Sequence, residues 1–214
     1  MTLVLLTASH FESQGLAARM PPMTPEVIGV GPVAAALGAA TAIATDPPPS
    51  AVILLGLAGT RDPDRLPVGS VLQASEVVDE AVGAGHGHGF VPLADMGLPA
   101  ADRLPERIPV VTAPAEAVPD APWVTGPLGM VAAASADGDD AAGWRARHPE
   151  VLAEEMEGYA VALACRRASA PLAILRGISN VAGDRDHSRW RFDEALDAVA
   201  HAATIWLATM RPPR

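Results

Sequence analysis

Residues 152–165 read LAEEMEGYAVALAC and place three carboxylates around a methionine, directly before a run of small apolar residues. In an extended chain, successive side chains point to opposite faces. This period puts Glu155 and Glu157 on one face and Glu154 with Met156 on the other. A solvated acidic turn is the alternative, since runs of charge are usually solvated. An exposed turn, however, has little reason to include a methionine.

The rest of the chain alternates short strand-like runs with alanine-rich helical runs, a pattern typical of an α/β domain with a mostly parallel sheet. The expected strands cover residues 3–6, 27–29, 51–57, 70–78, 123–125 and 172–178. The expected helices cover residues 32–44, 158–168 and 193–210. Asp193 is expected to cap the last helix. Glu157 would lie at the N-terminus of the helix expected over residues 158–168, where the helix dipole favours the ionised form of its carboxyl group.

Length and composition narrow the class of protein. A chain of 214 residues can bury a sizeable core, and residues 1–214 are expected to form one domain, with loops over residues 83–122. The longest apolar run, AVILLGLAG, is too short to cross a bilayer, which needs about 20 residues. The apolar N-terminus indicates a first strand rather than a signal peptide. We therefore expect a soluble protein.

Charge and basic residues exclude several activities. The net charge is −10, and without a cluster of basic residues the chain is not expected to bind nucleic acid. All 15 basic residues are arginines, which excludes a Schiff-base lysine and a P-loop lysine. A single cysteine, Cys165, cannot form a disulfide framework and fits a reducing cytoplasm. Chemistry must therefore come from carboxylates, amides, hydroxyls, histidines or backbone groups.

Two glycine-containing segments follow strand-like runs. In IGVGPVAAALGAA, Gly29, Gly31 and Ala34 match a G-x-G-x-x-A spacing, but no acidic residue follows at the distance a dinucleotide site requires. A tight turn that lets a helix pack closely on the sheet is the preferred interpretation. In LLGLAGTRD, the glycines at the end of a buried strand would let a ligand approach the backbone. An ordinary strand-to-loop turn explains that segment equally well.

The histidines and the cysteine give weaker signals. GHGHG at residues 85–89 holds two histidines, but a zinc site needs three or four ligands, so a surface loop is the preferred interpretation. His10 is interpreted as a hydrogen-bonded structural residue. Cys165, on an apolar helix, is interpreted as a small core residue. No metal site is predicted.

Several motifs together resemble the nucleoside phosphorylase and nucleosidase family over nearly the whole chain. In chain order they are LLTASHFES, GVGPVAAALGAA, GLAG, PVGSVLQASEVVDE, EMEGYAVA and RGISN. Their order and spacing carry the resemblance more than any single motif. The resemblance implies a three-layer αβα fold around a central mixed, partly barrelled sheet. It also implies a nucleoside substrate, no cofactor, and a homodimer or higher homo-oligomer whose subunits complete each other's sites.

The same resemblance assigns roles to Glu12, Glu155 and Glu157. Glu12 stands where this family carries a catalytic acid. Glu157 would bind the ribose hydroxyls, with Met156 packing beside the nucleoside and Glu155 supporting the site. Cleavage of an N-glycosidic bond passes through an oxocarbenium-like ribosyl group, so carboxylates near the sugar act on developing positive charge. Glu12 is the predicted general base that aligns the nucleophile.

The purine would be held by the glycine loop and the last strand motif. Ala58 and Gly59 of GLAG belong to the family's ligand loop. Adenine-specific members carry an aspartic acid where this chain has Asn180. An amide can donate toward N7 and the 6-oxo group of hypoxanthine or guanine. Asn180 therefore predicts a 6-oxopurine nucleoside as the substrate.

The nucleophile is predicted from a missing arginine. Phosphorylases of this family carry an arginine shortly before the glycine loop to hold phosphate, whereas residues 53–55 here are Ile, Leu and Leu. Water is therefore the expected nucleophile. Arg61 and Arg185, chosen by loop position, are candidates to meet a substrate carboxylate. The alternatives that stay open are a methylthioadenosine or adenosylhomocysteine nucleosidase, another purine nucleosidase or phosphorylase, and a purine sensor without catalysis.

Overall fold

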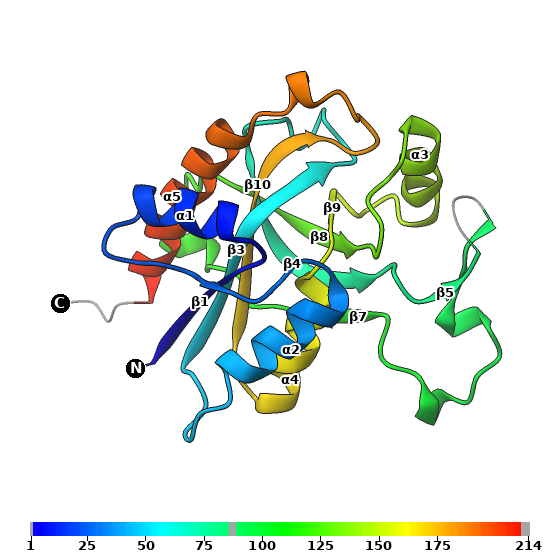
Figure 1. Ribbon diagram of the computed structural model, residues 1–214, viewed down its shortest axis with the longest axis horizontal. Coiled ribbons are helices and arrows are strands. Elements are labelled where there is room, and N and C mark those ends of the chain that lie inside the picture. The colour runs from blue at the N-terminus through cyan, green and yellow to red at the C-terminus, as the bar shows by residue number, and fades with distance from the viewer. Residues whose placement is uncertain (1, 86–88, 211–214) are drawn as a thin grey trace.

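The sheet is built on β3 (Ala51–Thr60), a strand of ten residues that is buried along almost its whole length. The computed structural model describes residues 2–85 and 89–210 (Figure 1). β3 pairs in parallel with β1 and β10 and antiparallel with β9. The other bounds are β1 Leu3–Thr7, β2 Glu26–Val27, β4 Val71–Asp79, β5 Gly83–Ala84, β6 Val91–Pro92, β7 Arg107–Pro109, β8 Val124–Met130, β9 Ala153–Glu155 and β10 Leu172–Val181.

The sheet closes on itself because β10 has two long-strand partners. β10 pairs with β3 on one side and with β4 on the other, and β4, β8, β9 and β3 follow one another in the hydrogen-bonded order. These five strands therefore form a ring, from which β1 and β2 extend at one side and β7 at another. The mixture of parallel and antiparallel pairs and the partial closure confirm the predicted mixed, partly barrelled sheet.

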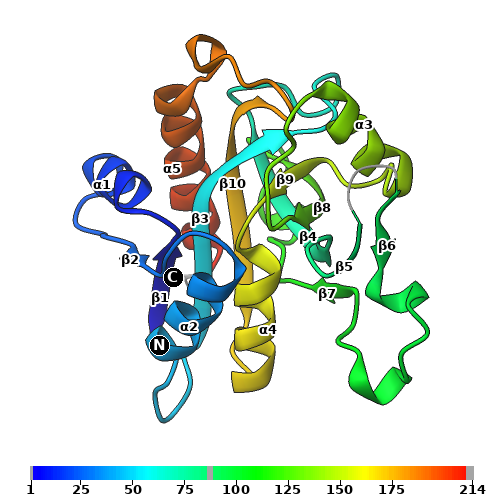
Figure 2. The same ribbon diagram turned by 45° about the vertical axis from the view of Figure 1, so that its right-hand side comes forward.

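Helices cover the sheet on two sides, as Figures 1 and 2 show. One apolar cluster joins α2 and α4 to the sheet, and a second joins α1 and α5 to the opposite side. This arrangement confirms the three-layer αβα prediction. The helix bounds are α1 His10–Arg19, α2 Pro32–Ala42, α3 Gly138–Arg147, α4 Gly158–Ala168 and α5 Phe192–Thr209, with short 3-10 turns at Leu93–Asp95, Ala100–Asp102, Ala115–Ala117 and His187–Arg189.

The predicted elements exist, but several have different limits. The helix expected over residues 158–168 has those bounds. β2 ends at Val27, because Gly29 has a φ of 98° and turns the chain out of the strand. β3 continues through the glycines to Thr60, and β8 is longer than expected. The sequence analysis did not predict α1 or α3.

The N-cap assigned to Asp193 is wrong. α5 begins at Phe192 with Arg191 at the N-cap position, so Asp193 lies in the first turn. Its carboxylate forms an exposed ion pair with Arg19 of α1, at 3.1 Å. An acidic residue in the first turn still interacts favourably with the helix dipole.

The region of residues 83–122 is mainly loop, as predicted, and its described residues include the short strands β5, β6 and β7 and the 3-10 turns that begin at Leu93, Ala100 and Ala115. The histidines of GHGHG, residues 86 and 88, lie outside the described residues. Cys165 is buried in the core, as expected. Across residues 2–85 and 89–210, no helix has the length and apolarity required to cross a membrane.

Candidate active site

Glu12 is fixed at the carboxyl end of β1, in the first turn of α1. Ser9 caps this helix, and the two residues form a capping box in which the Ser9 N–H and hydroxyl donate to Glu12 Oε2 at 3.0 and 2.8 Å. The other oxygen, Oε1, accepts the backbone N–H of Leu57 at 3.0 Å. The carboxylate of Glu12 therefore joins the start of α1 to the GLAG segment of β3.

Arg176 on β10 lies beside Glu12 and is completely buried. Its guanidinium forms an ion pair with Glu155, and its Nη2 is 3.6 Å from Glu157 Oε2. A Cβ on Gly56 would clash with Arg176 Nη1 and would lie 2.6 Å from Glu12 Oε1. The first glycine of GLAG is thus required because two charged groups lie directly over its backbone.

Glu155, the last residue of β9, and Glu157, at the N-cap position of α4, have different partners. Glu155 accepts the N–H groups of Glu157 and Gly158 at 3.0 and 2.8 Å, so its carboxylate caps the first turn of α4. Glu157 accepts the N–H of Gly31 at 2.8 Å. The predicted alternation is confirmed, because Glu155 and Glu157 both face Arg176 while Glu154 has other partners.

Burial and the neighbouring carboxylate of Glu155 raise the pKa of Glu157 to about 7, although Arg176 and the Gly31 N–H oppose this shift. Glu155 and Glu12 contribute negative charge around the same guanidinium. One buried arginine in the middle of β10 thus faces three carboxylates, which come from the first turn of α1, the end of β9 and the N-cap of α4. Such a surplus of negative charge suits a reaction in which positive charge develops.

A small cavity of about 80 Å³ lies next to this cluster. Among its lining residues are Gly59, Met156 and Asn180, all predicted site residues, together with Ser135 and Trp190. The cavity is therefore bounded by the ends of β3, β9 and β10 and by the loops that follow β8 and β10.

Asn180 lines this cavity, and its amide nitrogen lies beside Gly59, which also lines it. Its Oδ1 accepts the Ser179 hydroxyl at 2.8 Å, and its Nδ2 lies so close to Gly59 that a Cβ there would be 3.2 Å away. Nδ2 donates one bond to the Val181 carbonyl, at 3.0 Å, and an amide nitrogen has a second N–H. Ala58, in contrast, packs in the apolar core and lies outside the set of residues that line the cavity.

The two arginines proposed for a substrate carboxylate are separated by the structure. Arg61 is buried in ion pairs with Glu80 and Glu154, at 2.8 and 3.1 Å, so its assignment to the mouth of the site is wrong. Arg185 is exposed, lines the cavity, and has its guanidinium 5.4 Å from the centre of the Trp190 ring. Its contact with substrate remains a prediction.

Sequence reasoning missed Arg176 and Trp190. A signal for Arg176 was present, because LAILRGIS places one arginine in an otherwise apolar strand, and a buried charge requires partners. Trp190 lies in a loop with no periodic pattern.

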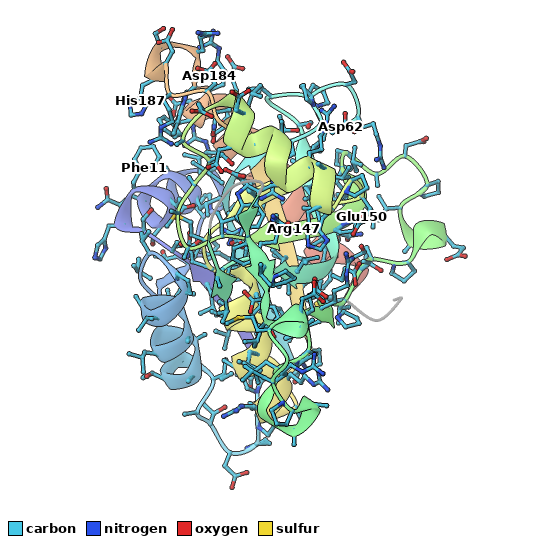
Figure 3. The ribbon with its side chains drawn as sticks, turned by 90° about the vertical axis from the view of Figure 1, so that its right-hand side faces the viewer. Phe11, Asp62, Arg147, Glu150, Asp184 and His187 are labelled. Carbon is cyan, nitrogen blue, oxygen red and sulfur yellow. The ribbon has the colours of Figure 1, made fainter. Side chains whose placement is uncertain are left out.

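Figure 3 shows Phe11 of α1 and His187 of the 3-10 turn on the same side of the molecule. The rings of Phe11, Phe192, Trp190 and His187 contact one another in sequence, with centroids 4.5–5.5 Å apart.

These features define the class of the protein. The chain belongs to the phosphorylase superfamily, whose family model matches residues 21–210. It is 39% identical over 178 residues to a futalosine hydrolase from Streptomyces coelicolor, an alignment that covers 81% of this chain and 74% of the relative. It is 32% identical over 189 residues to a 5'-methylthioadenosine/S-adenosylhomocysteine nucleosidase from Geobacillus thermodenitrificans, covering 85% and 76%.

Solved structures agree with the fold. The 5'-methylthioadenosine/S-adenosylhomocysteine nucleosidase from Streptococcus pneumoniae, solved with a transition-state inhibitor, superposes with a TM-score of 0.78 at 21% identity. The match covers 99% of this chain and 100% of that one. At this identity the likeness supports the fold alone.

Proposed function

We propose that this chain hydrolyses the N-glycosidic bond of futalosine and releases hypoxanthine, a step of the futalosine route of menaquinone biosynthesis. One observation carries the proposal: the carboxylate cluster around Arg176 borders a cavity that Asn180 also lines. The Streptomyces coelicolor relative, named as a futalosine hydrolase, supports the choice of substrate. The single cysteine is consistent with action in the cytoplasm, as expected from the sequence.

Each residue of the cluster has a part in bond cleavage. Glu12, held by Ser9 and Leu57, takes a proton from the attacking water. Glu157 binds the ribose hydroxyls and, when ionised, stabilises the positive charge that develops on the sugar. Arg176 favours the ionised forms of the carboxylates around it. Asn180 donates a hydrogen bond to the purine, which leaves with the electron pair of the broken N-glycosidic bond and then takes up a proton from solvent.

Water fits this site better than phosphate as the nucleophile. The residues before Gly56 are Ile53, Leu54 and Leu55, and all three are completely buried and apolar. The nearest guanidinium, that of Arg176, already faces three carboxylates. A phosphate dianion placed there would be repelled by the surplus negative charge, whereas a neutral water molecule would not.

The mouth of the site suits the carboxylate of futalosine. Arg185 is exposed beside Trp190, and the adjoining rings of Phe192 and Phe11 offer an apolar surface for an aryl group. An arginine that stacks on tryptophan keeps its N–H groups available for a carboxylate. Arg185 thus replaces Arg61 as the proposed contact.

The proposal includes self-association through α2. Val33 and Leu37, one helical turn apart on this helix, are 75% and 68% exposed, and Val30 just before it is 60% exposed. Gly31, which separates Val30 from α2, also donates to Glu157 of the site. A second copy on this face would therefore cover apolar surface close to the sugar-binding carboxylate, as expected for a homodimer.

A methylthioadenosine or adenosylhomocysteine nucleosidase is the second candidate, supported by the relative from Geobacillus thermodenitrificans. The two activities differ in the released base. Purified protein incubated separately with futalosine, inosine and methylthioadenosine should release hypoxanthine from futalosine with the highest kcat/KM. Preferential release of adenine from methylthioadenosine would favour the second candidate. Tight purine binding without turnover of any nucleoside would support a sensor.

A further inference from the structure

Glu154 lies on β9 directly before Glu155 of the active site but belongs to a separate cluster. Its Oε2 accepts Arg61 Nε at 3.1 Å, and Arg61 Nη1 is 2.8 Å from Glu80 Oε2. All three side chains are at least 96% buried. Arg61 is therefore paired with one carboxylate on β9 and one directly after β4, and it holds the carboxylate of Glu154 in one orientation.

The carboxylate of Glu154 has a second partner, Ser135. Oε1 accepts the Ser135 N–H at 2.8 Å, and Oε2 accepts its hydroxyl at 2.7 Å. Ser135 is completely buried. Both oxygens of one carboxylate thus bind a single residue, which fixes the backbone and the side chain of Ser135 together.

Ser135 belongs to the segment that joins β8 to α3, and this segment forms one wall of the cavity beside Asn180. Val131, Ala134 and Ser135 all line that cavity. The segment is tied at its start, where the Val131 N–H donates to the Glu155 carbonyl at 2.8 Å. It is tied again at α3, where Asp137 caps the helix. Between these two ends, Glu154 holds it at Ser135.

We propose that Glu154 is a positioning residue for the purine: anchored by Arg61, it holds Ser135 and so keeps residues 131–135 in place as a wall of the base pocket. The inference rests on the proposed function for the nature of the ligand. The glutamates of this segment then have different roles, since Glu155 and Glu157 act on the sugar side while Glu154 shapes the base side. Figure 3 faces α3, the helix that follows this wall, with its Arg147 labelled.

The test separates base binding from bond cleavage. Glu154→Gln keeps the size of the side chain. A carboxylate accepts these bonds with two oxygens, whereas an amide has only one oxygen and cannot accept from Arg61 and from both Ser135 donors. We expect the KM for futalosine and the Kd for free hypoxanthine, measured by calorimetry, to rise about tenfold, while kcat stays within about threefold. Ser135→Ala removes only the hydroxyl bond and should raise both values by a smaller factor.

Two further variants make the test specific. Glu76→Gln serves as the matched control, because it breaks a 2.8 Å ion pair with Arg107 that lies outside the cavity lining, and it should leave KM and Kd unchanged. The double variant Glu154→Gln/Ser135→Ala should be no weaker in hypoxanthine binding than Glu154→Gln alone, because both changes act on one contact.

The outcomes distinguish this inference from the proposed function. If Glu154→Gln leaves both KM and Kd unchanged, or lowers kcat at constant KM, Glu154 does not position the base and the inference is wrong, even if futalosine is cleaved. If the wild type binds hypoxanthine, and Glu154→Gln weakens that binding without any cleavage of futalosine, the inference stands and the proposed substrate is wrong.

Discussion

The molecule holds two buried arginine–carboxylate clusters that resemble each other electrostatically and differ in their neighbours. Arg176 faces Glu12, Glu155 and Glu157, whereas Arg61 pairs with Glu80 and Glu154. In each cluster, burial raises the pKa of one carboxyl, that of Glu157 or Glu80, to about 7.

What separates the clusters is what else their carboxylates contact. Glu12 and Glu157 accept backbone N–H groups from Leu57 and Gly31, which lie in two glycine-containing segments, one within β3 and one before α2. The side chain of Glu80, which is not among the residues that line the cavity, accepts only from Arg61 in the hydrogen bonds described. A raised pKa therefore marks both a candidate catalytic group and a structural one, and geometry must distinguish them.

The largest difference between the clusters should appear at Glu12. Glu12→Gln removes the proposed general base and should lower kcat about 100-fold or more with a limited effect on binding. Steady-state kinetics on futalosine measure this, with Glu26→Gln, an exposed glutamate, as the control. Near-native turnover of Glu12→Gln would remove Glu12 from the chemistry.

Glu157 should give the next largest effect, together with a pH signature. Its carboxyl is protonated below a pKa of about 7, so kcat/KM should fall as the pH drops through that value. Glu157→Gln removes a charged acceptor of the ribose hydroxyls and should lower kcat/KM about tenfold to hundredfold. It should also abolish the pH dependence near 7. A pH profile that is unchanged in the variant would assign the titration to another group.

A variant of Asn180 tests whether the cavity beside the Arg176 cluster selects the purine base. In Asn180→Asp, an ionised carboxylate would face O6 of hypoxanthine and leave this acceptor unsatisfied, at a cost of about 1–3 kcal/mol. The preference for 6-oxo over 6-amino nucleosides should therefore fall roughly tenfold to hundredfold. The ratio of kcat/KM for inosine and adenosine measures it, and an unchanged ratio would show that Asn180 does not select the base.

Glu80 should have the smallest effect on activity and a clear effect on stability. Its pKa is raised in the folded state, so the folded protein binds this proton more tightly than the unfolded chain does. Stability from this group is present at low pH and is lost as the pH rises from about 4.5 to about 7, by roughly 2–4 kcal/mol. Glu80→Gln should flatten the free energy of unfolding over that range and leave kcat/KM within about twofold. Denaturant melts at several pH values check the first expectation, and a large loss of turnover would contradict the second.

The sequence predicts best where local pattern and tertiary environment agree. α4 was predicted with its observed bounds because a glycine, a run of alanines and a preceding carboxylate all favour a helix start at Gly158. α1 was missed because HFESQGLAAR is only weakly amphipathic, although the Ser9-x-x-Glu12 spacing is a capping-box signal. β8 was shortened because Pro127 and its neighbouring glycines are unusual in a strand interior.

The site was predicted in part for a similar reason. The motifs located Glu12, Glu155, Glu157 and Asn180, which the structure brings together at one end of the sheet. The position of an arginine in the sequence could not show which one faces these carboxylates. Arg61 and Arg176 both follow apolar runs, and only the pairing of β10 with β3 places Arg176 beside Gly56.

The rate of hypoxanthine release from futalosine in phosphate-free buffer tests the central proposal most directly. Protein freed of phosphate should release hypoxanthine at its full rate and leave a free sugar product, and added phosphate should not accelerate the reaction. A strict requirement for phosphate, with formation of a sugar 1-phosphate, would contradict hydrolysis by the Glu12 and Arg176 cluster.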